Sequence, residues 1–124
     1  MDEYKLWLKK ALDDLSWTKH NIETKEYAGA CFSAQQAVEK ALKAYLLYKG
    51  ESLRRTHDVV ILLDGCIEFD KSFIKLEKLV EKLFPYYSTT RYPFGDELFS
   101  FEKTRAEEAS SVASKVVKFV ERKF

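Results

Sequence analysis

The stretch from Tyr27 to Tyr48 constrains the fold more than any other part of the sequence. It has no proline and no glycine after Gly29 and is rich in alanine, so nothing in it interrupts a helix of about six turns. A helix that is apolar over so much of its circumference belongs in the middle of a bundle or at a dimer interface. Its apolar residues form two stripes at helical spacing, Cys31, Ala34, Val38, Ala41 and Tyr45 on one and Phe32, Leu42 and Leu46 on the other.

Four further segments have helical periodicity, at residues 2–24, 59–67, 73–84 and 104–120. Together with the central stretch they predict an all-α fold, an up-and-down bundle of about five helices. Because short connections join antiparallel neighbours, we expect the first, second and last helices to form the bundle, with the shorter pair against it.

Several residues predict where these helices begin and end. We expect Gly50 to end the central helix and Thr56 to cap the next one, with Asp58 in its first turn. Pro85 should end the helix before it, because proline disfavours helical geometry in the preceding residue. Asp70 and Ser72 are competing start signals for that helix, and Thr104 with Glu107 has the spacing of a capping box for the last one.

Length and composition limit the class of protein. A chain of 124 residues is one domain, residues 1–124, and only 4 glycines and 2 prolines argue against a sandwich or barrel of many hairpins. A formal charge of +1 gives no overall field that would attract nucleic acid or an acidic membrane, so any anion site must be local. The apolar runs are too short to span a membrane and residues 1–5 are not those of a signal peptide, so we expect a cytoplasmic protein.

The two cysteines predict buried thiols. Cys31 and Cys66 lie in apolar helical stretches and have no metal-ligand spacing, as expected in a reducing compartment. A disulfide is the alternative, because lysine and glutamate dominate the charged residues while asparagine and glutamine are scarce, which is typical of heat-adapted proteins.

The connection from Pro85 to Lys103 is the first candidate for function, because long loops in compact bundles are usually functional or disordered. Seven aromatic residues between Phe84 and Phe101 can bury enough surface to order it. Among them lies Arg91, whose planar guanidinium suits a phosphate or a base. Alternatively, Arg91 pairs with Asp96, with Glu97 or with a neighbouring helix and only fixes the loop.

The second candidate is a polar surface on the central helix, formed by Gln35, Gln36, Glu39, Lys40 and Lys43. Polar groups in a central helix need partners, so these side chains form either a network that fixes packing or dimer register, or part of a ligand site.

The two histidines are weaker candidates for functional residues. His57 lies at the start of a helix, where it could act as a base or hydrogen-bond donor or be only a surface residue. His20 and Glu23 have the reverse of the order found in di-iron bundles, and no second pair exists, so we expect no metal. P-loop, dinucleotide-binding and hydrolase-elbow motifs are absent from the sequence, and we expect no cofactor.

Four parts of the sequence together resemble the HEPN domain family in its small stand-alone prokaryotic form. They are the segment ACFSAQQAVEKALKA at residues 30–44, Thr56-His57-Asp58, Thr90-Arg91-Tyr92-Pro93 and the closing helix rich in alanine and valine. The resemblance implies a helical bundle, commonly a homodimer, often associated with a minimal nucleotidyltransferase and linked with nucleotide or RNA binding.

Many proteins of this family are metal-independent ribonucleases or toxins with an Arg followed, four to six residues later, by a His. Arg91 matches the Arg of this motif, but Gly95, Asp96 and Glu97 occupy the positions of the His. A carboxylate is a weaker proton acceptor than imidazole near neutral pH. The tyrosine that follows the His in AMPylated toxins is missing as well.

The resemblance therefore favours a binding module over an enzyme: a homodimer, paired with a minimal nucleotidyltransferase in a toxin–antitoxin-like system, that holds a nucleotide. The expected ligand-binding residues are Arg91, Gln36, Glu39, Lys40, Lys43, Tyr92 and Asp96. One alternative is a ribonuclease in which Arg91 acts with His57, or with Asp96 and Glu97, in place of the usual His. The other is a structural dimerisation bundle.

Overall fold

The computed structural model describes residues 2–92 and 100–124, and these residues form helices and no strand. The helices are α1 (Glu3–Glu23), α2 (Tyr27–Tyr48), α3 (Val59–Phe69), the 3₁₀ helix η1 (Lys71–Leu76), α4 (Glu77–Leu83), α5 (Tyr86–Thr89) and α7 (Lys103–Glu121). The predicted all-α fold and its five main helices are confirmed, and α5 is a short addition.

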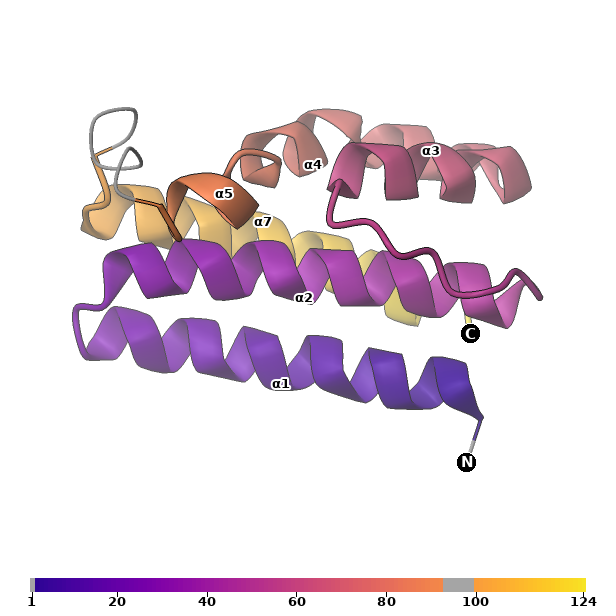
Figure 1. Ribbon diagram of the computed structural model, residues 1–124, viewed down its shortest axis with the longest axis horizontal. Helices are drawn as coiled ribbons and strands as arrows, with labels where there is room; N and C mark the ends of the chain where they lie inside the picture. The colour runs from indigo at the N-terminus through magenta and orange to yellow at the C-terminus, as the bar shows by residue number, and fades with distance from the viewer. Residues whose placement is uncertain (1, 93–99) are drawn as a thin grey trace.

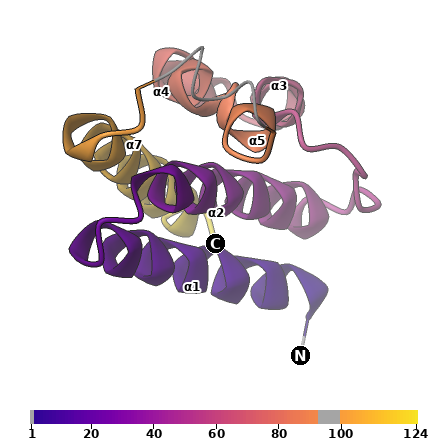
Figure 2. The same ribbon diagram turned by 60° about the vertical axis from the view of Figure 1, so that its left-hand side comes forward.

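The long helices lie side by side, with α1 antiparallel to both α2 and α7 (Figure 1). The start of α1 and the ends of α2 and α7 meet at one end, where the Tyr4 ring lies 5.0 Å from Tyr48 and 5.3 Å from Phe124, centre to centre. Helices α3, α4 and α5 form a layer on the other side of α2 from α1 (Figure 2). The central helix is therefore α2, and every side chain from Ala41 to Leu46 is buried.

The connection of residues 49–58 runs back along α2 before α3 begins (Figure 1), so α3 has the same direction as α2. Gly50 has a φ of +92°, which confirms the predicted glycine after the end of α2. The expected cap at Thr56 is wrong. Asp58 caps α3, because its Oδ1 accepts hydrogen bonds from the backbone N of Val60 (2.9 Å) and Ile61 (3.1 Å), while the Thr56 hydroxyl accepts one from the N of Asp58.

The helix before Pro85 ends at Leu83, which confirms the predicted end near Phe84, although the expected geometric reason does not hold. Phe84 keeps helical geometry (φ −47°, ψ −46°) in front of Pro85, which precedes α5 as its N-cap residue. Proline is tolerated there because the first turn of a helix leaves its backbone N–H groups unpaired in any case. The capping box at Thr104 is also wrong: α7 begins at Lys103 after an extended Glu102 and has no side-chain cap.

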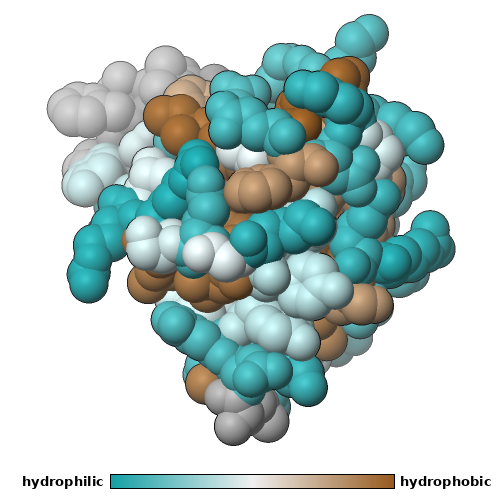
Figure 3. Space-filling model, turned by 90° about the vertical axis from the view of Figure 1, so that its right-hand side faces the viewer, coloured by the Kyte–Doolittle hydropathy of each residue, from teal (hydrophilic) through white to brown (hydrophobic). Residues whose placement is uncertain are grey.

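The described helices enclose one apolar core and two free thiols. Cys31 and Cys66 are buried and unbonded to each other, so the predicted thiols are present. The end of the molecule in Figure 3 is mostly hydrophilic, with small, separate hydrophobic areas. Within residues 2–92 and 100–124, none of the helices has both the length and the apolar character needed to cross a membrane.

Candidate functional site

The buried carboxylate of Glu39 on α2 is the centre of a polar cluster. Its side chain is only 3% exposed. Its Oε2 accepts from Nζ of Lys43 at 3.0 Å, and its Oε1 accepts from Nε2 of Gln35 at 3.4 Å and of Gln36 at 3.3 Å. Nδ1 of His57 lies 3.1 Å from the same Oε1. A buried carboxylate needs such partners, because desolvation otherwise disfavours its charge.

His57 is held from both sides just before α3. Nε2 of Gln35 donates to its backbone oxygen at 3.1 Å, and Asp58, the next residue, caps α3. The imidazole lies on the ring of Tyr87, with the centres 4.0 Å apart and the planes 12° apart. Its side chain is 52% exposed. Glu39 and Tyr87 thus fix the orientation of a histidine that a ligand can reach.

The ring of Tyr87 also contacts Arg91. The guanidinium carbon of Arg91 lies 4.6 Å from the centre of the Tyr87 ring and 5.8 Å from that of Tyr92. Both Arg91 and Tyr92 are exposed. A cation above a ring is attracted by the negative charge on the ring face.

Tyr87 lies on α5, and Arg91 follows two residues after the end of this helix, in a turn in which its backbone N donates to the backbone oxygen of Ser88 at 3.1 Å. The hydroxyls of Thr89 and Thr90 donate to backbone oxygens one turn earlier. Tyr86 is buried on the opposite side, where its hydroxyl accepts from Nη1 of Arg105 on α7 at 3.1 Å. Burial raises the pKa of Tyr86, although the hydrogen bond from Arg105 acts in the other direction. This anchor ties α5 to α7.

The structure brings together most of the residues that the sequence singled out. We name the group formed by Gln36, Glu39, Lys43, His57, Tyr87, Arg91 and Tyr92 the Tyr87 cluster. Lys40 lies apart from it, because its Nζ pairs with Oδ2 of Asp14 on α1 at 2.7 Å. Asp96 and its alternative partner Glu97 lie outside the described residues.

Tyr87 itself was not predicted as a site residue. It was counted only among the aromatic residues of the connection. The usable signal was its position four residues before Arg91, because side chains at this spacing lie close together wherever the backbone makes a helical turn.

Within the part of the chain that the structure describes, no buried side-chain N or O atom lacks a hydrogen-bond partner. Glu39, Lys43 and Gln35 are therefore supports whose bonds are already made. His57, Arg91 and Tyr92 are the exposed members that remain accessible. In the same residues, no group of three His, Cys, Asp or Glu side chains could hold a metal ion. The accessible chemistry is that of an imidazole, a guanidinium and aromatic rings.

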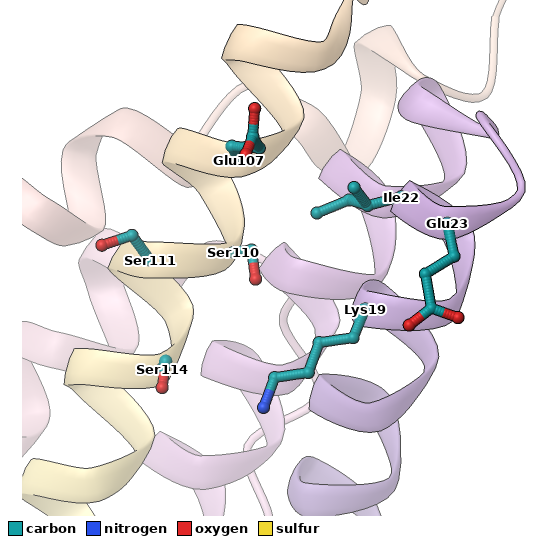
Figure 4. Close-up of a pocket in the computed structure, with 7 residues that line it drawn as sticks. All are labelled: Lys19, Ile22, Glu23, Glu107, Ser110, Ser111 and Ser114. Carbon is teal, nitrogen blue, oxygen red and sulfur yellow. The ribbon is translucent and has the colours of Figure 1, made fainter.

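A groove of about 480 Å³ between α1 and α7 has a different character (Figure 4). Lys19 and Ile22 of α1 point toward α7, whose serines line the opposite wall. Among the described residues that line it, Lys19 is accompanied by two glutamates, Glu23 and Glu107, and none is aromatic. This balance of charge does not favour an anion.

Comparisons with known proteins agree on one family. A model of the HEPN domain matches residues 4–123. The protein of Methanocaldococcus jannaschii named "Putative toxin MJ1304" is 31% identical over 129 residues, which cover 94% of this chain and 84% of that protein.

Solved structures share the fold. The structure of TT1696 from Thermus thermophilus matches with a TM-score of 0.89 and 33% identity over 100% of both chains. An HEPN domain protein from Thermotoga maritima matches with a TM-score of 0.70 and 29% identity over 94% of each chain. ST0689, an archaeal HEPN homologue, has a TM-score of 0.79 at 24% identity, covering 99% of this chain and 98% of its own.

Proposed function

The chain belongs to the HEPN domain family, and on that premise we propose that it is a toxin-like member that binds a nucleotide through the Tyr87 cluster. In this role it is the accessory subunit of a minimal nucleotidyltransferase. The proposal concerns binding, because imidazole is missing from the positions four to six residues after Arg91.

One observation carries the proposal: Arg91 and His57 both contact the ring of Tyr87 at an accessible surface. The guanidinium offers a planar fork of donors for phosphate oxygens. Aromatic rings offer a face on which a base stacks. The negative charge of Glu39 does not oppose a phosphate, because Lys43 already pairs with it below the surface.

Titration of AMP into the protein by calorimetry tests this function. We expect saturable binding, weakened about tenfold or more by Arg91→Ala, since a hydrogen bond to a charged group contributes about 1.5–3 kcal/mol. Arg122→Ala is the matched control, because Arg122 is an exposed arginine at the end of α7. Absence of saturable binding, or equal binding by wild type and Arg91→Ala, contradicts the proposal.

The partner is tested separately. A reading frame for a short nucleotidyltransferase next to this gene would support the pairing. We expect the two proteins, when coexpressed, to sediment as one complex, and this chain alone to sediment as a homodimer. Separate sedimentation of the two proteins contradicts the accessory role, and a monomer contradicts the homodimer. A dimer that binds neither nucleotide nor enzyme would favour the purely structural alternative.

Ribonuclease activity is the second candidate, favoured by the contact between His57 and Glu39. The carboxylate at Nδ1 orients the imidazole, whose Nε2 has no hydrogen-bond partner among the described residues and could accept a proton from a 2′-hydroxyl. This candidate predicts cleavage of RNA in the presence of a chelator, abolished by His57→Gln and by Arg91→Ala. Intact RNA at high protein concentration rules it out.

A further inference from the structure

A hollow of about 330 Å³ lies between the start of α3 and the end of α4, and no residue of the Tyr87 cluster is among the described residues that line it. Val60 and Phe84 give it an apolar lining, and Asp58 and Glu81 add a carboxylate from each side. Phe84 is 49% exposed although it is a large apolar residue. We name this space the Phe84 hollow. It offers an apolar side chain of another molecule a place to be buried.

The charge around the Phe84 hollow is negative. Helix α3 and its cap residue carry three carboxylates and no lysine or arginine, although the chain has 21 of these cations and a formal net charge of +1. Asp64 and Glu68 are exposed on α3, and Glu81 is exposed on α4. The negative charge is therefore local to this layer of the molecule, which lies on the other side of α2 from α1 (Figure 2).

The two carboxylates at the hollow remain available to a cation. Oδ1 of Asp58 accepts the hydrogen bonds of the α3 cap, while its Oδ2 has no hydrogen-bond partner among the described residues. The start of a helix attracts anions, but the charge of Asp58 already compensates this end of α3. Lys82, which follows Glu81, pairs with Glu108 on α7 at 3.7 Å. An approaching ammonium or guanidinium group therefore meets negative charge that is not yet paired.

Apolar and acidic residues alternate along the exposed face of α3 next to the hollow. Ile61, which follows Val60, is 50% exposed, and Asp64 and Glu68 lie three and seven positions further on. Side chains at this spacing share one face of a helix. From Asp58 to Glu68 this face is about 15 Å long, which matches about three turns of a partner helix.

We propose that the Phe84 hollow and the acidic face of α3 bind a cationic amphipathic helix of a partner protein. One apolar side chain of that helix fills the hollow between Val60 and Phe84, and lysine or arginine residues one turn away contact the surrounding carboxylates. The same negative charge repels nucleic acid and anionic membranes. The proposal goes beyond nucleotide binding and does not depend on it, because it uses no residue of the Tyr87 cluster.

A synthetic peptide tests this surface. The probe is a fluorescein-labelled helical peptide of about 15 residues, built of alanine with one central leucine and with lysines three and four positions on either side of it. We expect its fluorescence anisotropy to rise saturably with the concentration of the full chain. A peptide with alanine in place of the central leucine should bind about tenfold more weakly, because no large apolar side chain is then buried. A peptide with glutamates in place of the lysines should not bind.

Substitutions in the protein locate the bound peptide. We expect Glu81→Gln to weaken binding about threefold at low salt and to have no effect at high salt, because the carboxylate forms an ion pair at the surface. Glu77→Gln is the matched control, because Glu77 is exposed on the same helix but is not among the described residues that line the hollow. Phe84→Ala should weaken binding about tenfold. Urea unfolding checks that this variant is folded, and the alanine-centred peptide tests the same contact without changing the protein.

Several results overturn the proposal. Equal affinities of the leucine-centred and alanine-centred peptides show that the hollow holds no side chain. Equal binding of the glutamate peptide overturns a cationic partner, and equal weakening by Glu77→Gln and Glu81→Gln overturns the location. If Phe84→Ala abolishes self-association of the protein in sedimentation, a second copy covers the hollow instead. Absence of peptide binding also overturns the proposal, whereas the proposed nucleotide site is tested separately through Arg91.

Discussion

Glu39 contacts more of the side chains that form the site than any exposed residue does, although its own carboxylate is buried. Four side chains direct a nitrogen at its two oxygens, and Lys43 among them is as deeply buried as Glu39 itself. Removing one charge of such a pair leaves the other in a medium that solvates it poorly. The orientation of His57 therefore depends on a charge balance beneath the surface.

We expect Glu39→Gln to destabilise the protein by about 3–5 kcal/mol, because it leaves the Lys43 ammonium buried without a counterion. Unfolding in urea measures the change. Glu108→Gln is the control: Glu108 pairs with Lys82 at 3.7 Å, and both side chains are about half exposed, so the loss should stay below about 1 kcal/mol. The double variant Glu39→Gln, Lys43→Met should recover part of the stability. Equal losses for Glu39→Gln and Glu108→Gln would show that the buried pair is not special.

Helical spacing identified residues of α2 that lie in the Tyr87 cluster, but it could not show which neighbour each one faces. Glu39 contacts His57 in the connection of residues 49–58, whereas Lys40, on the same polar surface, pairs with Asp14 on α1. The choice depends on how α1 packs, which a pattern within one helix does not contain. Tyr87 was overlooked for a similar reason, because its importance comes from the ring of a residue thirty positions earlier.

At the scale of elements, the connection of residues 49–58 decides how His57 is presented. It returns along α2 and ends at Asp58, which caps α3, so that only this cap residue separates His57 from the helix. A cap satisfies backbone donors that the first turn of a helix otherwise leaves unpaired. The first turn of α3 and the place of the imidazole are therefore fixed together.

We expect Asp58→Ala to cost about 1 kcal/mol of stability and Thr56→Ala less, since only the Asp58 side chain accepts from the backbone of α3. Denaturant unfolding of both variants measures the difference. Because the cap also positions His57, Asp58→Ala should broaden the NMR signals of its imidazole. A larger cost for Thr56→Ala would restore Thr56 as the effective cap.

The ion pair between Lys123 and Asp70 joins the end of α7 to the start of η1 and makes stability depend on pH. Lys123 donates to Asp70 at 2.8 Å, and the Ser72 hydroxyl and backbone N donate as well. These bonds hold the pKa of Asp70 well below its ordinary value of 3.8. The unfolded chain thus binds this proton more readily, so the stabilisation is complete above about pH 4 and is lost as the pH falls toward the folded pKa.

We therefore expect Asp70→Asn to lower stability at neutral pH, with a difference from wild type that shrinks as the pH falls to about 3. Urea unfolding at several pH values measures both curves. Asp64→Asn serves as the control, because Asp64 is exposed on α3. A constant difference between wild type and Asp70→Asn across this range would show that the ion pair is not the cause.

Periodicity predicted which segments form helices, whereas the residues that cap the starts of α3 and α7 could not be predicted in the same way. The long segments of α1, α2 and α7 agree with the sequence because apolar spacing reflects the face that each helix buries. The cap of α3, by contrast, was predicted at Thr56 with Asp58 in the first turn, and only the geometry of the connection shows that Asp58 is the cap. The helical geometry on either side of Pro85 is a case in which tertiary packing overrides a local preference.

For the whole molecule, the burial of side chains around α2 is the main source of stability. The two thiols show the effect of this burial in their pKa values. Burial raises the pKa of Cys31 to about 12 and raises that of Cys66 as well. Both are completely inaccessible to solvent. Since the thiolate is the reactive form, neither cysteine should react while the core is intact.

We expect iodoacetamide to modify neither Cys31 nor Cys66 in the native protein at neutral pH, and to modify both in denaturant. Mass spectrometry after increasing times of exposure counts the modified residues. The rate for the native protein should follow global unfolding, so Glu39→Gln should accelerate both cysteines together. Rapid modification of one cysteine in the wild type would reveal local opening of the helix that carries it.

The Tyr87 cluster consists of two contributions that are independent along the chain. His57 and its buried support come from residues 35–57, whereas Arg91 follows α5, a helix of only four residues, and the two side chains meet at the ring of Tyr87. Substitutions in the segment that holds Arg91 can therefore change ligand binding without disturbing the buried residues that support His57. Relatives that keep these buried residues but differ in α5 and the residues after it would acquire new specificities at little cost to folding.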